Sequence, residues 1–127
     1  MNLVAIVIGL ALVEYFVFGL LVGRARGQYG IAAPAMSGHP IFERYMRVHQ
    51  NTMEQLIVFV PAMVMFGIYA SGRIAALLGL VWIAGRAVYL RGYVADPAKR
   101  STGFVLSALP QLILLLGGIV GALVTAF

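Results

Sequence analysis

Four apolar stretches dominate the chain, and each has about the length of a membrane-spanning helix. They run approximately over residues 2–23, 53–69, 74–93 and 104–127. A helix needs roughly 20 predominantly apolar residues to cross the hydrocarbon core of a bilayer. Hydrophobic residues make up 62% of the 127 residues and charged residues only 10%, whereas soluble domains average roughly 45–50% and about 25%. The sequence therefore predicts a single all-α, four-helix transmembrane domain over residues 1–127.

Basic residues gather in two of the three connections between these stretches. Six of them lie in the first and third connections: Arg24, Arg26, Arg44, Arg47, Lys99 and Arg100. The second connection holds only Arg73. Because loops rich in Lys and Arg face the cytoplasm, we expect both termini on the non-cytoplasmic side of an integral, multi-pass protein. In a prokaryote this would be the inner membrane. The first connection, residues 24–47, contains several Gly and Pro residues and is expected to be an ordered surface loop.

A dense polar segment, Arg47-Val-His-Gln-Asn-Thr-Met-Glu54, leads directly into the second apolar stretch. Arg47, Asn51 and Glu54 recur at helical spacing, so they project from one face of a helix that we expect over about residues 48–69. A carboxylate, an amide and a guanidinium are costly to hold at the mouth of a membrane helix and are typical of functional sites. This stripe predicts a site for a polar ligand.

A second polar stripe lies on the third expected helix, over residues 74–93. Arg86, Tyr89 and Tyr93 follow one helix face, and Arg100 comes soon after. The topology brings this stripe and the first one to the same membrane face. Tyrosines alone are explained by an interfacial aromatic belt, and arginines alone by lipid headgroups. Neither alternative explains the amide and the carboxylate of the first stripe, so a binding site is favoured.

The side chains of the two stripes constrain the chemistry of the ligand. Several arginines imply carboxylates or phosphates, which guanidinium groups bind bidentately, and Glu54 implies an amine or amide donor. A small zwitterion with two carboxylates fits this set, and the apolar surroundings indicate a lipophilic second reactant from the bilayer. His39 and His49 stand apart and cysteine is absent, so neither a metal site nor a protein thiolate is expected. The net charge of +5 suits a membrane surface or an anionic ligand better than nucleic acid.

Two further charges, Glu14 and Arg86, are expected inside the membrane. Both lie roughly 10–13 Å below the proposed cytoplasmic face at the usual rise per residue. Because an unpaired charge there costs roughly 2.5–3.5 kcal/mol, we expect them to form a structural pair inside the bundle or across a subunit boundary. Glu54 is the competing partner for Arg86.

Two segments of the chain resemble the MAPEG family, the membrane-associated proteins in eicosanoid and glutathione metabolism. They are Phe42-Glu-Arg-Tyr-Met-Arg-Val-His-Gln-Asn-Thr-Met-Glu54 and Gly85-Arg-Ala-Val-Tyr-Leu-Arg-Gly-Tyr93, with Arg100 following. The family includes microsomal glutathione transferases and leukotriene C4 synthase. The resemblance extends over all four stretches and implies a homotrimer of four-helix bundles, with glutathione bound between subunits.

The resemblance also implies roles for individual residues. It assigns six residues to glutathione binding, namely Arg47, His49, Asn51, Glu54, Tyr89 and Tyr93. It assigns Arg100 to stabilisation of the glutathione thiolate. Arg24 aligns with a basic residue that reaches glutathione from an adjoining subunit, although Arg26 is an alternative for that place. Gln55 stands where the leukotriene branch has a tyrosine, which argues against that specialisation.

These observations predict a glutathione S-transferase that acts on lipophilic electrophiles, with glutathione as co-substrate and no metal. A thiol with a pKa of about 8.5 is mostly protonated at neutral pH, and a neighbouring guanidinium favours the reactive anion. Glutathione-dependent reduction of lipid hydroperoxides is available to the same site. The main alternative is a non-catalytic, lipid-binding scaffold of the same family, which would have no need of Arg100. A transporter subunit would predict broken helices or repeats, which the sequence lacks.

Overall fold

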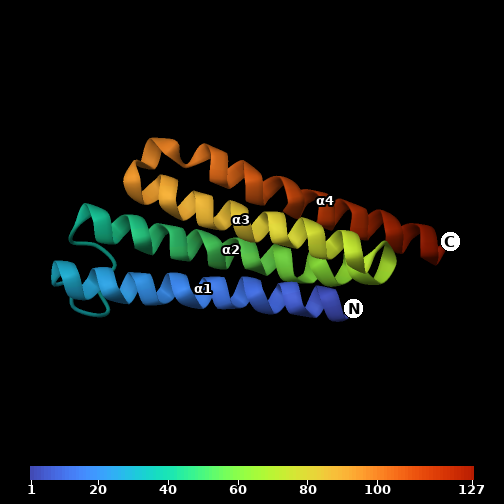
Figure 1. Ribbon diagram of the computed structural model, residues 1–127, viewed down its shortest axis with the longest axis horizontal. Helices are drawn as coiled ribbons and strands as arrows, with labels where there is room; N and C mark the ends of the chain where they lie inside the picture. The colour runs from blue at the N-terminus through green and yellow to red at the C-terminus, as the bar shows by residue number, and fades with distance from the viewer.

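The computed structural model describes all residues, 1–127, as four long helices with short connections (Figure 1). The helices are α1 (Asn2–Tyr29), α2 (Pro40–Tyr69), α3 (Gly72–Ala95) and α4 (Ser101–Ala126), with a short 3-10 helix, η1 (Pro97–Lys99), between the last two. Figure 1 shows an elongated bundle with both termini at one end and η1 at the other. All four long helices are apolar enough to cross a membrane. The predicted all-α, four-helix class is confirmed.

The first connection is shorter than we expected from the sequence. α1 continues to Tyr29 and α2 already begins at Pro40. The loop that we expected over residues 24–47 is therefore confined to residues 30–39. Hydropathy locates only the part of a helix that lies in lipid, and both helices continue beyond that part as polar helix. Arg24 and Arg47 consequently lie on helices and not in a loop.

Local signals at the two helix ends explain these boundaries. Gly30 ends α1 in the left-handed conformation, with φ of 67°, which glycine adopts without a steric penalty. His39 caps α2, because its Nδ1 accepts a hydrogen bond from the backbone N–H of Ile41 at 3.1 Å. Pro40 occupies the first turn, where its missing N–H leaves no helical hydrogen bond unmade. Together these residues fix where the polar stripe of α2 begins.

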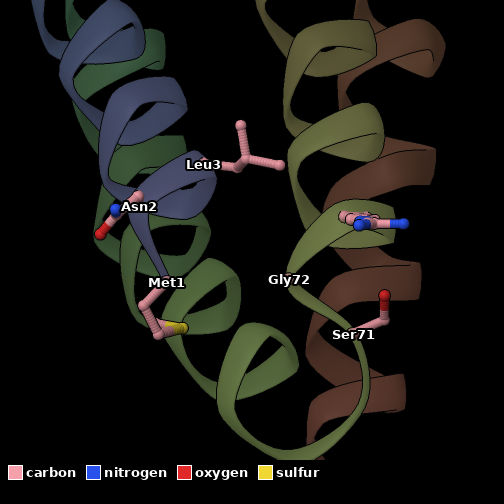
Figure 2. Close-up of a pocket in the computed structure, with 6 residues that line it drawn as sticks. Met1, Asn2, Leu3, Ser71 and Gly72 are labelled. Carbon is pink, nitrogen blue, oxygen red and sulfur yellow. The ribbon is translucent and has the colours of Figure 1, made fainter.

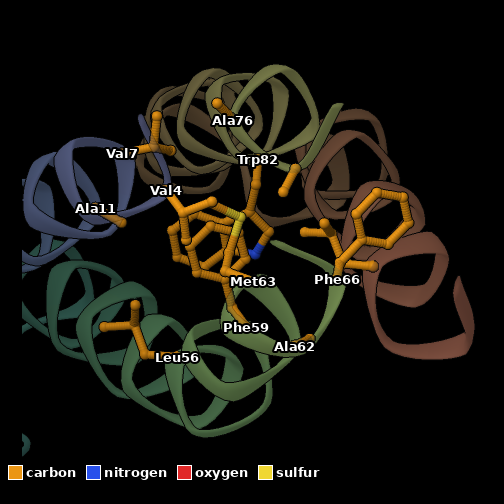
Figure 3. Packing of buried hydrophobic residues seen from close by; sticks show 12 residues of the cluster. Val4, Val7, Ala11, Leu56, Phe59, Ala62, Met63, Phe66, Ala76 and Trp82 are labelled. Atoms are coloured by element: carbon orange, nitrogen blue, oxygen red, sulfur yellow. The ribbon is translucent and has the colours of Figure 1, made fainter. Parts of the chain in front are cut away.

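The main apolar core lies in the half of the bundle nearest the termini, and Figure 3 shows its side chains packed between the helices. α2 and α3 pack against each other and against both α1 and α4. At the centre, the rings of Phe59 and Trp82 stack with their centroids 4.1 Å apart. The indole N–H of Trp82 donates to Gln111 Oε1 at 3.0 Å, so the core leaves no indole donor unpaired. The half with η1 has less apolar packing and carries the polar stripes.

The outer surface of the bundle is largely apolar. Large hydrophobic side chains from all four helices are exposed, among them Leu20, Ile57, Leu77 and Val124 at 59–74%. A soluble monomer rarely exposes apolar surface on this scale, whereas lipid tails solvate it without cost. Of the 101 backbone hydrogen bonds, 90 lie within the helices, and such internal bonding is the main requirement for crossing a bilayer. The chain is an integral, multi-pass membrane protein.

Candidate functional site

Six of the residues that we assigned to the site from the sequence line one cavity at the end of the bundle away from the termini. The cavity has a volume of about 500 Å³ and is lined by Arg47, Asn51, Glu54, Tyr89, Tyr93 and Arg100. Its volume lies within the range of about 300–1,000 Å³ that is typical of small-molecule sites. The stripes on α2 and α3 therefore do meet, and the start of α4 completes the wall.

A close contact between α3 and α4 places Arg100 at this cavity. Gly103 packs directly against the backbone of Tyr89 and leaves no room for a Cβ atom. The first turn of α4 therefore lies on the same helix face of α3 that carries Tyr89. Arg100 precedes Gly103 by three residues, and its Nη1 donates to the carbonyl oxygen of Pro97 at 3.1 Å. This bond holds the guanidinium beside η1 and at the edge of the cavity.

The charges of the cavity are mixed, with an excess of positive charge. Arg47 and Arg100 supply two guanidinium groups and Glu54 supplies one carboxylate. All three side chains are exposed, and Arg47 and Glu54 make no hydrogen bond within the chain. The rings of Tyr89 and Tyr93, which also line this cavity, have their centroids 5.7 Å apart. Such a set can bind a zwitterion that carries more than one carboxylate and one ammonium group.

Arg86 lies behind the cavity wall and is fully buried. Its Nη1 donates to Asn51 Oδ1 at 2.9 Å, and its guanidinium carbon lies 4.3 Å from the centre of the Tyr89 ring. The structure has no ion pair between Arg86 and Glu14, whose Oε1 is buried without a hydrogen-bond partner. The hydrogen bond of Arg86 goes to Asn51 of α2 instead, and its pairing with Glu14 inside the bundle stays a prediction. Glu54, the competing partner, is exposed and does not contact it through a hydrogen bond; pairing across a subunit boundary stays a prediction.

Arg24 and His49 lie outside the cavity within a single chain. His49 stacks on Tyr15 of α1, with ring centroids 4.4 Å apart, so it lies on the side of α2 that faces α1. Arg24 is exposed and lines a separate pocket of about 140 Å³ between α1 and α2. Arg26, the alternative, donates its Nη1 to the carbonyl oxygen of Ala35 at 2.8 Å and so holds the α1–α2 loop. Of the two arginines, Arg24 is the one with no partner in its own chain.

A second cavity adjoins the first on its apolar side. Its volume is about 360 Å³, and its lining consists of Asn51, Tyr89, Arg100, Ser101, Phe104 and Val105. The first three residues also line the polar cavity. Phe104 and Val105 are 40% and 56% exposed on the apolar surface, so this second cavity opens toward the membrane. We did not identify Phe104 or Val105 from the sequence, because apolar residues in a membrane helix have no distinguishing spacing.

A further cavity, of about 540 Å³, lies at the opposite end of the molecule (Figure 2). It lies between the start of α1 and the α2–α3 turn and is lined by residues 1–3 and 71–73. Arg73 is the one charged side chain in its lining, which contains no carboxylate and no tyrosine. It therefore lacks the converging polar groups of the cavity around Arg47. No group of three or more metal-binding side chains occurs anywhere in the chain.

Comparison with known proteins matches the chain to one family. The MAPEG family model matches residues 4–120. An uncharacterised protein of Synechocystis is 44% identical over 94% of this chain and 87% of its own length. Human microsomal glutathione S-transferase 2 is 43% identical over 80% of this chain and 70% of its own length. Mouse leukotriene C4 synthase is 34% identical over 80% of this chain and 66% of its own length.

Proposed function

This chain belongs to the MAPEG family, and from that premise we propose that it is a membrane-embedded glutathione S-transferase. The observation that carries the proposal is the cavity of about 500 Å³ in which two arginines, a glutamate, an asparagine and two tyrosines converge from three helices. Relatives that are named glutathione S-transferases cover most of the chain at 41–43% identity.

The polar cavity complements the charges of glutathione. The tripeptide carries two carboxylates, one ammonium group and one thiol. Arg47 binds a carboxylate, since guanidinium and carboxylate match in a bidentate fork. Glu54 binds the ammonium group, and Asn51 and the hydroxyls of Tyr89 and Tyr93 bind the peptide and carboxylate oxygens. The cysteinyl sulfur then lies toward Arg100, where the two cavities join.

Arg100 and the start of α4 stabilise the thiolate form of glutathione. A guanidinium within hydrogen-bonding distance favours the anion, and a helix N-terminus adds about half a positive charge. The thiol loses its proton to solvent, and its sulfur becomes the nucleophile. The sulfur electron pair forms a bond to the electrophilic carbon, and the leaving group departs with its own bonding pair.

The apolar cavity beside Arg100 receives the second substrate from the bilayer. Phe104 and Val105 line it and face the lipid, so a lipophilic electrophile reaches the sulfur without crossing water. Holding both reactants at one place supplies much of the rate advantage through proximity. A lipid hydroperoxide fits the same cavity: one thiolate attacks its terminal oxygen to give an alcohol and a sulfenic acid, and a second glutathione converts the latter to the disulfide and water.

We also propose a homotrimer whose glutathione sites lie between subunits and open to the cytoplasmic face. The support is the position of Arg24, which is exposed, has no partner in its own chain and lies apart from the cavity. In a trimer this side chain would reach the cavity of its neighbour. Native mass spectrometry of the detergent-solubilised protein tests the stoichiometry, and a monomer with full glutathione affinity would exclude this arrangement.

Two measurements on the purified protein in detergent test the function. Calorimetry should detect glutathione binding, and an absorbance assay with 1-chloro-2,4-dinitrobenzene should detect conjugation. Arg73→Ala, at the far end of the molecule, is the control and should change neither. Binding without any turnover, on electrophiles or lipid hydroperoxides, would favour the lipid-binding scaffold. The absence of glutathione binding would reject the proposal.

A further inference from the structure

The contact between Arg86 and Asn51 determines which way the amide of Asn51 faces. A guanidinium group carries five N–H donors and no acceptor, whereas an asparagine amide has one acceptor oxygen and one NH2 donor. Only the oxygen of Asn51 can therefore face Arg86, in agreement with the bond of 2.9 Å from Nη1 to Oδ1. The NH2 group of Asn51 must point to the other side of the amide.

That other side belongs to the cavities. Asn51 lines both the polar and the apolar cavity, whereas Arg86 lines neither. The NH2 group of Asn51 is therefore the part of this side chain that a bound molecule meets. An amide without such a neighbour can rotate and offer either its donor or its acceptor, so Arg86 removes one of the two choices.

Arg86 itself is held firmly enough to impose this choice. It is fully buried, and its guanidinium lies over the Tyr89 ring at 4.3 Å and near the Trp82 ring at 5.9 Å. Cation–π contacts of this length stabilise a desolvated guanidinium. Its Nε and Nη2 have no hydrogen-bond partner, so the bond to Asn51 is its one strong polar contact. Moving Asn51 away would leave a buried cation with no hydrogen bond at all.

We propose that Arg86 is a positioning residue that fixes Asn51 as a donor toward the glutathione cavity and thereby selects for an acceptor oxygen of the ligand at that point. The inference rests on the proposed function for the identity of the ligand. The orientation of the Asn51 amide does not depend on the proposed function. Arg86 also supports the ring of Tyr89. Asn51 on α2 and Tyr89 on α3, which line both cavities, therefore lie against the same buried cation.

Asn51→Asp tests the acceptor side and the donor side of the Asn51 amide separately. A carboxylate still accepts a hydrogen bond from Arg86, now as a charged acceptor, but it offers no donor to the ligand. We expect the unfolding temperature in detergent to stay at or above that of the wild type, while the Kd for glutathione rises about 10- to 100-fold. Asn51→Leu, which loses both sides, should lower the unfolding temperature and the affinity. Thr52→Val is the matched control, because Thr52 is buried beside Asn51 with an unpartnered hydroxyl and should leave glutathione affinity unchanged.

Variants of Arg86 test its action through Asn51. Arg86→Met removes the donor, so the KM for glutathione should rise about ten-fold with a smaller change in kcat. Arg86→Gln keeps an NH2 group that can donate to Asn51 and should recover part of the KM. A residue with only a packing role would show no such rescue, since Met and Gln have similar volumes. Equal KM values for the two variants, or for Arg86→Met and the wild type, would overturn the proposal.

The unfolding temperatures distinguish a failure of the proposed orientation of Asn51 from a failure of the proposed function. If the wild type fails to bind glutathione, the proposed function is wrong, but the unfolding temperatures still report the amide orientation. An Asn51→Asp variant as unstable as Asn51→Leu would show that Arg86 does not face the oxygen. If the wild type binds glutathione and Asn51→Asp binds it equally well, the function stands and the selective role of Asn51 fails.

Discussion

Replacing Gly103 by alanine is expected to force α3 and α4 apart beside the proposed glutathione cavity. An added Cβ would lie against the backbone nitrogen and Cα of Tyr89 and 2.8 Å from its Cβ. Carbon atoms in contact normally lie about 3.5–4.0 Å apart, so the Cβ pair alone requires a separation of roughly 0.7–1.2 Å. The backbone contacts require more, and a backbone cannot rotate away as a side chain can.

Two opposing effects set the change in the free energy of unfolding. Alanine is more favourable than glycine by about 0.8–1 kcal/mol in a helix interior, and this is the upper limit of the gain at Gly103, which lies in the first turn of α4. Overpacking a tight contact costs about 1–3 kcal/mol, and the upper part of that range applies because the clash is with backbone. We therefore expect a net loss of about 1–2 kcal/mol. Since Tyr89 lines both cavities, a displacement of about 1 Å can also lower turnover by up to roughly 100-fold.

Unfolding in mixed micelles measures the change in stability, and the conjugation assay with 1-chloro-2,4-dinitrobenzene measures the change in turnover. Gly9→Ala is the matched control, because Gly9 lies inside α1 and an added Cβ there meets nothing within 4 Å. That variant should be as stable as the wild type or slightly more stable, with unchanged turnover. If Gly103→Ala behaved in the same way, the close contact between α3 and α4 would be wrong, and with it the position of Arg100.

Three other predictions concern the chemistry, the orientation and the buried charges. Arg100→Ala should lower kcat for conjugation roughly ten-fold or more and change the glutathione KM less, whereas Arg47→Ala should mainly raise that KM. Thiolate absorbance after rapid mixing measures the role of Arg100, and undiminished thiolate formation in Arg100→Ala would disprove that role. Reporter fusions at Ser71 and at the C-terminus should both report the non-cytoplasmic side, and a cytoplasmic signal from the C-terminus would reverse the proposed topology. A double-mutant cycle of Glu14→Gln with Arg86→Met should show a coupling of about 0.5–3 kcal/mol in detergent if these side chains pair across a subunit boundary, and additive losses would exclude the pair.

The polar cavity could be predicted from the sequence because its parts are set locally. Arg47, Asn51 and Glu54 share one face of α2 by helical spacing alone. Their meeting with Tyr89 and Tyr93 follows from topology, since both stripes lie near the same end of neighbouring helices that run in opposite directions. The family resemblance added the role of Arg100, which no periodicity indicates.

The partner of Arg86 could not be predicted in the same way. Hydropathy gives the length of a helix but not its rotation about its own axis, and that rotation decides which neighbour a buried side chain meets. Charge pairing pointed to Glu14 or Glu54, whereas the structure provides the neutral amide of Asn51 at 2.9 Å. A guanidinium needs hydrogen-bond acceptors as well as opposite charge, so charge alone could not identify Asn51 as the partner of Arg86.

Helix ends beyond the membrane were missed for a related reason. Hydropathy falls at the polar segments around Arg24 and Arg47, although the chain remains helical through both. Gly30 and Pro40 set those boundaries through backbone conformation and a missing N–H. These signals are present in the sequence, but they compete with several other Gly and Pro residues nearby. The placement of His49 against Tyr15 likewise depends on how α1 packs, which the sequence does not specify.

The two adjoining cavities share Asn51, Tyr89 and Arg100, but the rest of the lining is polar in one and includes the apolar Phe104 and Val105 in the other. For the proposed reaction, the aqueous volume sets the concentration of the thiol substrate, whereas the volume of the membrane or micelle sets that of the lipophilic substrate. Adding empty lipid at a fixed total amount of electrophile therefore dilutes it within the bilayer and slows the reaction, while the KM for glutathione is unaffected. For a series of electrophiles that differ by single methylene groups, kcat/KM calculated from bulk concentrations will then follow partitioning into the membrane. It will rise roughly four-fold per methylene, which corresponds to about 0.8 kcal/mol. Only mole fractions in the membrane would reveal what the site itself selects.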